Sequence, residues 1–330
     1  MTIHEVAKEA GVSIATVSNV LNRPAIVAAA TRQRVQDAIG ALGFVRTEGA
    51  RQLHGLPAPV IAVMLPELAA PSAVELNRGI EEEASGRGFG TMVHSGRPQD
   101  AEAAGYVSFL ASQRVHGVVL VAGEWTDQAS GALRERGLPS VVVGDHRPRP
   151  STCSLRIDDT AGGIDALRHL RERGHRAIAW VDGPASLSPQ QGPPVKGPLT
   201  VRAGALTPEA GRQAGDELLA RSCRPTAIVC ADVALASGVL QSLYRAGLRV
   251  PDDVAVVGFD DGAHGLSAVV PLTTVQRPSA EMGRQAVRLL LREGATPLTH
   301  EHKHEHEHLV LRPELVVRAS SQRATAAMSG

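Results

Sequence analysis

From residue 59 onward, short apolar segments alternate with longer stretches of helical periodicity. The apolar segments are residues 60–65, 90–94, 117–122, 140–144, 177–182, 227–231 and 254–259, and the helical stretches include 74–86, 101–113, 162–173, 211–221 and 234–246. This alternation predicts parallel sheets with helices on both faces, because a strand returns through a helix before the next one pairs in parallel. The chain of 330 residues is long enough for two such lobes and a smaller additional domain.

The N-terminal residues show a different pattern, with two short apolar stripes at helical spacing. The first stripe comprises Ile3, Val6, Ala7 and Ala10, and the second comprises Val17, Val20 and Leu21. Gly11 can take the positive φ that ends one helix, and Ser13 can cap the next. We therefore expect a helix-turn-helix, with a third helix over residues 31–42 closing a small core.

The outward positions of the second helix carry small or neutral polar side chains. These positions are Ile14, Ala15, Thr16, Ser18, Asn19 and Asn22. Such groups suit base edges and phosphates, whereas a solvent-exposed amphipathic helix would usually carry Lys and Glu. DNA is the expected partner, and a helical hairpin that binds no nucleic acid is the alternative.

These residues resemble the head of the LacI/GalR family of bacterial transcription repressors. The shared pattern over residues 2–22 is Thr-Ile-x-x-Val-Ala-x-x-Ala-Gly-Val-Ser-x-x-Thr-Val-Ser-x-Val-Leu-Asn. The likeness continues through Gly43-Phe44, Ala50-Arg51-Gln52-Leu53, Arg78-Gly79-Ile80-Glu81, Gly174-His175-Arg176, residues 247–261, Pro271-Leu272-Thr273-Thr274-Val275 and Leu315-Val316-Val317-Arg318. The resemblance implies a homodimeric repressor on a near-palindromic operator, controlled by a small molecule, and it implies no catalysis.

The resemblance also implies a division of the chain. It predicts an all-α helix-turn-helix head over residues 1–46, a hinge over 47–57 and an α/β core that resembles periplasmic binding proteins over 58–318, followed by a flexible tail over 319–330. The core would consist of two doubly wound parallel-sheet lobes. We expect lobe 1 to comprise 58–156 and 275–295, and lobe 2 to comprise 157–274 and 296–318, with crossings near Ile157, Thr274 and Thr296.

Roles in DNA recognition follow from this resemblance. Ile14, Ala15 and Asn19 are expected to contact bases, and Ser13, Thr16, Ser18 and Asn22 to contact phosphates. The family often has Arg where this chain has Asn19, and Asn pairs with adenine rather than guanine. Thr47, Ala50 and Arg51 belong to the expected hinge, in which Leu53 would wedge into the minor groove; the alternative is that Leu53 is a packing residue.

The resemblance implies that an effector binds in the cleft between the two lobes, and the residues expected there depart from the family pattern. Ala70-Pro71-Ser72-Ala73 replaces the usual aromatics, and residues 186–206 have a Pro/Gly/Ser-rich, loop-like composition in place of a helix that carries an effector-binding Arg. The remaining candidate effector ligands are Ser72, Trp125, Asp145, Ser186, Asp232, Asp260 and Arg277. A carboxylate after a strand can instead cap the next helix. A sugar or related metabolite is the expected effector, and a regulator whose degenerate cleft senses no sugar is the alternative.

A run of alternating histidines precedes a short apolar segment near the C-terminus. It contains His300, His302, His304, His306 and His308. On a strand these side chains would share one face and could chelate zinc, nickel or copper. A solvated loop of low complexity is the alternative that we favour from sequence alone, because a regulatory metal site normally takes ligands from several elements.

Composition limits the remaining possibilities. The 34 basic and 34 acidic residues balance, and residues 1–56 carry a net charge of +2, so charge alone does not indicate nucleic acid. Three cysteines and no signal peptide predict reduced thiols in a cytoplasmic protein, and no apolar run predicts a membrane span. The chain contains no dinucleotide-binding glycine motif, nucleophile elbow or Walker loop, so an enzyme is disfavoured. The missing signal peptide and the DNA-binding head argue against a solute-binding module without a regulatory role.

Overall fold

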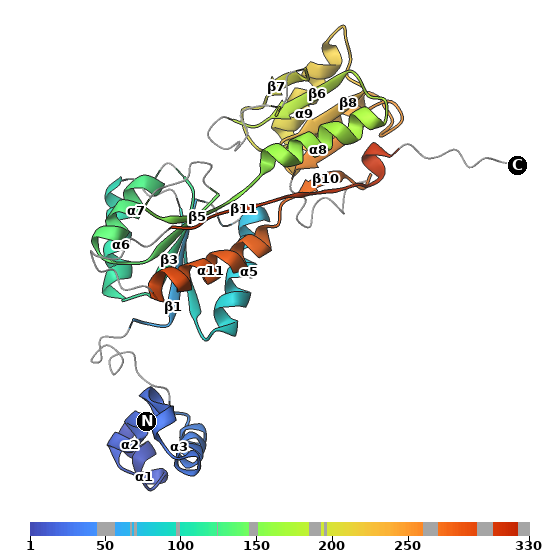
Figure 1. The fold of residues 1–330 in the computed structure, drawn as a ribbon. Helices are drawn as coiled ribbons and strands as arrows, with labels where there is room; N and C mark the ends of the chain where they lie inside the picture. The colour runs from blue at the N-terminus through green and yellow to red at the C-terminus, as the bar shows by residue number, and fades with distance from the viewer. Residues whose placement is uncertain are drawn as a thin grey trace, which may run out of the picture. The chain divides into compact units, whose positions relative to one another are not determined.

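The computed structural model of the chain separates into two compact units, Met1–Ala58 and Pro59–Gly330 (Figure 1). The structure describes residues 1–44, 57–66, 68, 71–96, 100–123, 125–144, 151–184, 193–194, 197–259, 270–295 and 306–322. Each unit has its own hydrophobic core, and each is described separately below.

The smaller unit is the predicted helix-turn-helix. It contains α1 (Ile3–Glu9), α2 (Ile14–Asn22), the 3₁₀ turn η1 (Pro24–Ile26) and α3 (Ala29–Leu42). Thr2 and Glu5 form a capping box at the start of α1, and Gly11 takes φ +63° in the turn. The two apolar stripes meet Val35 and Ala38 of α3 in one buried cluster, because helices this short are stable only when they bury apolar faces against one another.

The larger unit contains two six-stranded sheets. The first has the strand order β11-β5-β4-β3-β1-β2, and all its paired strands are parallel. Its strands are β1 (Val60–Leu65), β2 (Gly90–Ser95), β3 (Gly117–Val121), β4 (Ser140–Val143), β5 (Cys153–Ile157) and β11 (His308–Leu311). This sheet forms the core of lobe 1.

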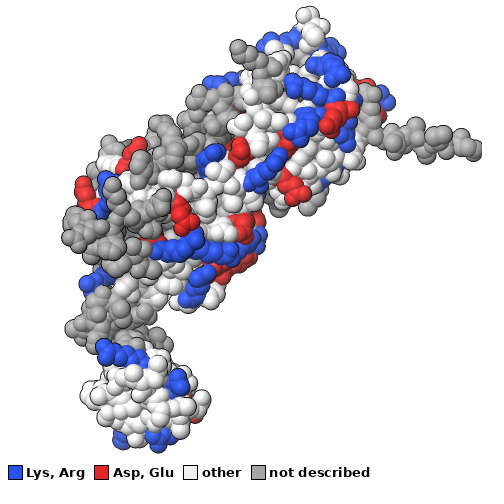
Figure 2. All heavy atoms as spheres, in the orientation of Figure 1, with Lys and Arg blue, Asp and Glu red and all other residues white. Residues whose placement is uncertain are grey.

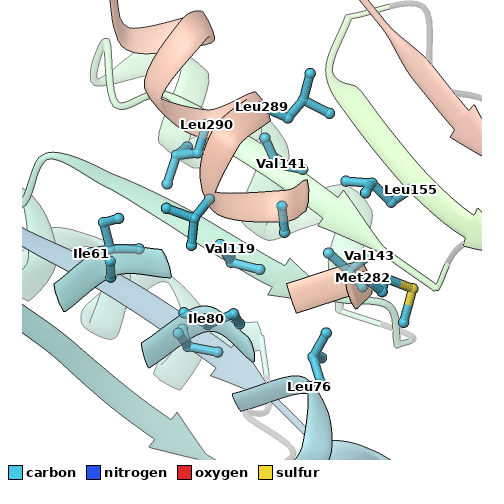
Figure 3. Packing of buried hydrophobic residues seen from close by; sticks show 14 of the residues in the cluster. Ile61, Leu76, Ile80, Val119, Val141, Val143, Leu155, Met282, Leu289 and Leu290 are labelled. Atoms are coloured by element: carbon cyan, nitrogen blue, oxygen red, sulfur yellow. The ribbon is translucent and has the colours of Figure 1, made fainter. Parts of the chain in front are cut away.

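Helices cover both faces of the lobe 1 sheet. On one face α5 (Pro71–Gly86) and α11 (Ser279–Ala295) pack on apolar residues of β1, β3, β4 and β5. Figure 3 shows Ile80 of α5 and Leu290 of α11 in this cluster. On the other face lie α6 (Asp100–Ser112) and α7 (Thr126–Glu135). A Cβ on Gly79 or Gly283 would meet the backbone of the facing helix, so α5 and α11 can approach this closely only through glycine.

The second sheet forms lobe 2 and has the strand order β12-β10-β9-β8-β6-β7. Its strands are β6 (Ile178–Asp182), β7 (Leu199–Arg202), β8 (Ala227–Cys230), β9 (Ala255–Phe259), β10 (Thr273–Gln276) and β12 (Glu314–Val316). Only the edge strand β12 is antiparallel to its neighbour among the described pairs. Helix α8 (Asp159–Glu172) packs on one face, and α9 (Pro208–Ala220) and α10 (Val233–Arg245) pack on the other.

Within the described residues the structure confirms the seven predicted strands and adds five. Strand β7 lies in the segment 186–206 that we interpreted as a loop, and it is the edge strand beside β6. The third crossing between lobes also differs from the prediction. It lies between β11 and β12 rather than near Thr296, because β11 pairs with the open edge of β5 in lobe 1. Such an edge pairing depends on a distant strand and leaves no local sequence pattern.

Two expectations from composition can be compared with the structure. The cysteines Cys153, Cys223 and Cys230 are all free thiols. Among the described residues, none of the helices is both long enough and apolar enough to cross a bilayer.

Candidate nucleic-acid interface and effector site

The N-terminus of α2 is held in place by its own cap. The backbone N–H of Thr16 donates to Ser13 Oγ at 3.1 Å, and the two hydroxyls lie 2.9 Å apart. Val17 and Val20 are buried against the other helices of the head. The rotation of α2 about its axis is therefore fixed, and with it the set of residues that faces outward.

The exposed face of α2 carries the predicted DNA-contacting residues. Ile14 is 40% exposed, and Ala15 and Asn19 are also exposed, whereas Thr16 and Ser18 are half-buried. The side chain of Asn22 lies outside the described residues. A neutral face of this kind, at a helix N-terminus whose backbone N–H groups attract phosphate, can approach the floor of a major groove without charge repulsion.

Charge on the head is modest. Its described residues include the basic side chains Lys8, Arg23, Arg32 and Arg34 and the acidic side chains Glu5, Glu9 and Asp37, a net charge of +1 without histidine. Figure 2 shows separate basic side chains on an otherwise mostly uncharged face of the head. Counterion release alone would then supply little affinity, so specific geometry must contribute strongly.

The predicted hinge lies outside the described residues. This applies to Thr47, Ala50, Arg51 and the proposed wedge Leu53. Their roles therefore stay predictions.

Comparison with known proteins identifies both parts of the chain. Residues 2–47 match the model of bacterial regulatory proteins of the lacI family, and residues 167–321 match a periplasmic binding protein-like domain. The chain is 31% identical to the transcriptional regulator DegA of Bacillus subtilis strain 168, covering 97% of this chain and 98% of that protein. The chain belongs to the LacI family.

Further regulators match this chain along almost its whole length. The transcriptional regulator MalR of Streptomyces coelicolor is 34% identical, covering 97% of this chain and 96% of that protein. The lac repressor dimer bound to operator and the anti-inducer ONPF matches with a TM-score of 0.82 and 26% identity, covering 98% of this chain and 99% of that one. This chain is thus a DNA-binding transcriptional regulator, and its named relatives are regulators rather than enzymes.

Four polar residues of this LacI-family regulator follow parallel strands at the same edge of the lobe 2 sheet. Asp182 ends β6, Arg202 ends β7, Asp232 follows β8 and Arg277 follows β10. Parallel strands bring their carboxyl ends to one edge, where α/β proteins bind ligands. Sequence reasoning selected Asp232 and Arg277 but missed Asp182 and Arg202; the signal for Asp182 was a carboxylate at the end of a buried strand.

Asp232 and Arg277 both have structural partners. Asp232 is the N-cap of α10 and accepts from the N–H of Ala234 at 2.7 Å, as the alternative interpretation expected. Burial raises the pKa of Asp232, and the nearby charge of Arg277 opposes that rise. Arg277 Nε lies 2.8 Å from an oxygen of Asp159, and its guanidinium lies 5.8 Å from the ring centre of Phe259.

Asp182 is fully buried at the same edge. It accepts from the N–H of Gly183 at 3.0 Å and pairs with Arg202 at 3.4 Å. The side chain of Arg202 is half exposed, so this pair joins the buried end of β6 to the surface.

The remaining candidate effector ligands are less informative. Trp125 is only 6% exposed and packs in the apolar cluster beneath α6 and α7, so the interpretation of this residue as an exposed stacking surface does not fit the structure. The physical reason is that its large apolar ring gains more from the core than from solvent. Ser72 is half-buried in the first turn of α5. Asp145, Ser186 and Asp260 lie outside the described residues.

Of the five histidines in the run, the structure describes His306 and His308. His300, His302 and His304 lie outside the described residues. His308 begins β11, and its Nδ1 lies 2.8 Å from Ser154 Oγ. His306 precedes the strand, and its Nδ1 lies 3.4 Å from an oxygen of Glu293. The two described histidines therefore contact different neighbours.

Proposed function

We propose that this regulator is a homodimeric repressor that binds a near-palindromic operator through α2 of each head. The observation that carries the proposal is the capped α2 helix with its neutral exposed face. The operator complex of the lac repressor dimer, a structure to which this chain is similar, supports the same arrangement. Two heads would occupy half-sites about one helical turn, or a small multiple of it, apart.

The proposed DNA contacts are of two kinds, contacts to base edges and contacts to the phosphate backbone. Asn19 donates to N7 and accepts from N6 of an adenine, while Ile14 and Ala15 contact a thymine methyl group. Ser13, Thr16, Ser18 and Asn22 hold phosphates, which set the register of the helix on the duplex. The hinge residues order on DNA, and Leu53 unstacks the central step of the operator.

The Asn19→Ala variant tests the proposed base contact. We expect affinity for the preferred operator to fall by about 1–3 kcal/mol and discrimination at one base pair of each half-site to relax, because a bidentate contact is lost. The measurement is fluorescence anisotropy on the operator selected by the wild-type protein and on single-base variants. Gln33→Ala is the matched control, since Gln33 is an exposed polar residue on α3.

Two outcomes would contradict this assignment. The first is selection of guanine at the base pair that responds to Asn19. The second is an equal loss of affinity in the Asn19→Ala and Gln33→Ala variants, which would indicate a general effect on the head.

We also propose that a small molecule, a sugar or related metabolite, binds at the carboxyl edge of the lobe 2 sheet and changes the affinity of the regulator for its operator. Carboxylates and guanidinium groups at this edge suit a hydroxyl-rich ligand. A CelR–cellobiose complex, 32% identical to this chain with a TM-score of 0.70 and covering 97% of this chain, supports a sugar. The burial of Trp125 favours the second candidate, a regulator that senses no sugar, because an exposed stacking ring is not available there.

Thermal unfolding with sugars and nucleosides in the presence of a chelator separates the two candidates. A ligand at about a hundredfold its dissociation constant should stabilise the protein by about 2.7 kcal/mol. A shift with one compound, together with a change in operator affinity, supports the effector proposal. Unchanged melting curves across the whole panel would favour the regulator without a sugar site.

A further inference from the structure

Three side chains with metal-binding chemistry meet in lobe 1, and none of them belongs to the proposed DNA contacts or to the proposed effector site. Cys153 is the first residue of β5, Glu293 lies in the last turns of α11, and His306 precedes β11. Their potential ligand atoms all lie within 4.8 Å of one another. The three residues come from three different parts of the fold. A metal site normally takes its ligands from several elements, and the histidine run by itself is a single segment.

The distances between these atoms are close to those in a tetrahedral site. Cys153 Sγ lies 3.8 Å from His306 Nδ1, and His306 Nδ1 lies 3.4 Å from Glu293 Oε1. Bonds of typical Zn–S, Zn–N and Zn–O length hold such ligand atoms about 3.4–3.6 Å apart. The thiol of Cys153 donates to Glu293 Oε2 at 2.9 Å, so this one pair must open slightly when a metal replaces the proton.

The surroundings are unusual for a carboxylate. Cys153 is 1% exposed and Glu293 is 8% exposed, and Cys153 belongs to the same apolar cluster as Leu289 and Leu290 of α11. Burying a carboxylate here is costly unless a strong partner compensates for the lost hydration. Glu293 already has partners, among them His306 Nδ1 at 3.4 Å and the thiol of Cys153 at 2.9 Å, and coordination to a divalent cation adds a stronger one.

Burial raises the pKa of the Cys153 thiol to about 12 and the hydrogen bond to Glu293 adds to that rise, whereas one backbone contact opposes it. The backbone N–H of Glu307 donates to Cys153 Sγ at 3.3 Å, which is how an outer-shell donor stabilises a metal-bound sulfur. Sulfur, imidazole nitrogen and carboxylate oxygen together suit Zn²⁺ better than Mg²⁺ or Ca²⁺, which prefer oxygen ligands.

We propose that Cys153, Glu293 and His306 form a Zn²⁺ site that ties the segment before β11 to β5 and α11. Binding releases the thiol proton to solvent and forms one bond each to sulfur, nitrogen and oxygen, and a water molecule supplies the fourth ligand of the tetrahedron. The site is independent of the proposed function, because neither DNA recognition nor the edge of the lobe 2 sheet involves these residues. The site also differs from chelation by the histidine run, because it uses His306 together with a thiol and a carboxylate from other parts of lobe 1.

Titration of the metal-free full-length protein with Co²⁺ tests the proposal, because Co²⁺ replaces Zn²⁺ and reports its ligands by absorption. We expect a thiolate-to-cobalt charge-transfer band and visible bands of a tetrahedral ion, both abolished by excess Zn²⁺. Cys153→Ser should remove the charge-transfer band. Glu293→Gln and His306→Gln should each weaken binding at least about tenfold.

Matched variants distinguish the site from other ligands. Cys223→Ser changes the exposed thiol and His308→Gln changes the neighbouring histidine, and both should leave the spectrum unchanged. The proposal is overturned if Cys153→Ser keeps the charge-transfer band. It is also overturned if Co²⁺ binding is lost when His300, His302 and His304 are all changed to Gln and survives in Cys153→Ser and Glu293→Gln.

A measurement on the wild-type protein avoids any folding defect of the variants. X-ray absorption at the zinc edge should show one sulfur at about 2.3 Å with nitrogen or oxygen ligands at about 2.0–2.2 Å. A first shell of nitrogen and oxygen alone would refute the site.

Discussion

Replacing Arg277 by alanine should lower the free energy of unfolding of the larger unit by about 3 kcal/mol, the lower end of the range for breaking a buried ion pair. Asp159 is 4% exposed and Arg277 is 16% exposed, and the pair is closed at 2.8 Å. Without the guanidinium, the carboxylate of Asp159 would stay buried without its cationic partner, and Asp232 would lose a nearby positive charge. Urea unfolding followed by circular dichroism measures the loss.

The Arg249→Ala variant is the matched control for Arg277→Ala. Arg249 also pairs with an aspartate, Asp253, at 2.9 Å, but its side chain is 70% exposed. An exposed pair contributes about 0–1 kcal/mol because water solvates both charges. Equal losses of unfolding free energy in the two variants would contradict the prediction, because the buried Arg277–Asp159 pair would then contribute no more than the exposed Arg249–Asp253 pair. The double variant Arg277→Met with Asp159→Asn should regain part of the loss, because it removes both buried charges.

The second large effect is a loss of stability on acidification that depends on His169. This residue lies in α8 and is 6% exposed, and burial together with the charges of Arg173 and His175 lowers its pKa from 6.5 to about 4. Arg173 donates to His169 Nδ1 at 2.9 Å, since a guanidinium can only donate. The proton of the neutral ring therefore resides on Nε2, which donates to Ser321 Oγ at 2.7 Å.

The direction of the pH effect follows from proton binding. Below about pH 6.5 the unfolded chain protonates His169, whereas the folded chain does not until about pH 4. The unfolded state binds more protons in this window, so stability falls as the pH falls through it. Above about pH 6.5 His169 is neutral in both states, so it causes no loss of stability there. Across the window the free energy of unfolding falls by at most about 3 kcal/mol, at about 1.4 kcal/mol per unit of pKa.

Unfolding free energies of the wild type and of His169→Gln between pH 4 and pH 7.5 measure this effect. Gln retains hydrogen-bonding capacity but does not titrate, so its stability should depend less steeply on pH. Parallel curves for the two proteins would contradict the assignment, whatever their absolute offset. Protonation of His169 occurs at Nδ1, so acidification removes the acceptor of Arg173, whereas the Nε2–H bond to Ser321 in the 3₁₀ turn η2 (Ala319–Ser321) is retained.

The head was predictable because its signals are local. The apolar stripes, the turn at Gly11 and the cap at Ser13 depend on residues within one or two helical turns of each other, and the structure confirms all three. The exposed positions of α2 follow from the same spacing. The motifs over residues 2–22 were specific enough to indicate the family before any fold was known, and the comparisons confirm it.

In lobes 1 and 2 the sequence predicted the fold class and seven strands, including the edge strand β2, but missed the interior strands β5 and β10 and the edge strands β7, β11 and β12. Central strands such as β3 and β8 are apolar throughout, because both of their faces are covered. Strand β7 lies in a segment rich in Pro, Gly and Ser, and strand β11 is short, partly exposed and directly preceded by the histidine run, so neither showed a clear strand pattern. Pairing with β6 and β5 supplies the hydrogen bonds that define them.

By itself, the sequence determined the helix-turn-helix, the two α/β lobes and the family. Only the tertiary structure decided which side chains meet. Cys153 and Glu293 are 140 residues apart, and Asp159 and Arg277 are 118 residues apart. Helix and strand periodicity act over a few residues, whereas these contacts depend on how whole elements pack. The same packing placed Trp125 in a core and made Asp232 the cap of α10.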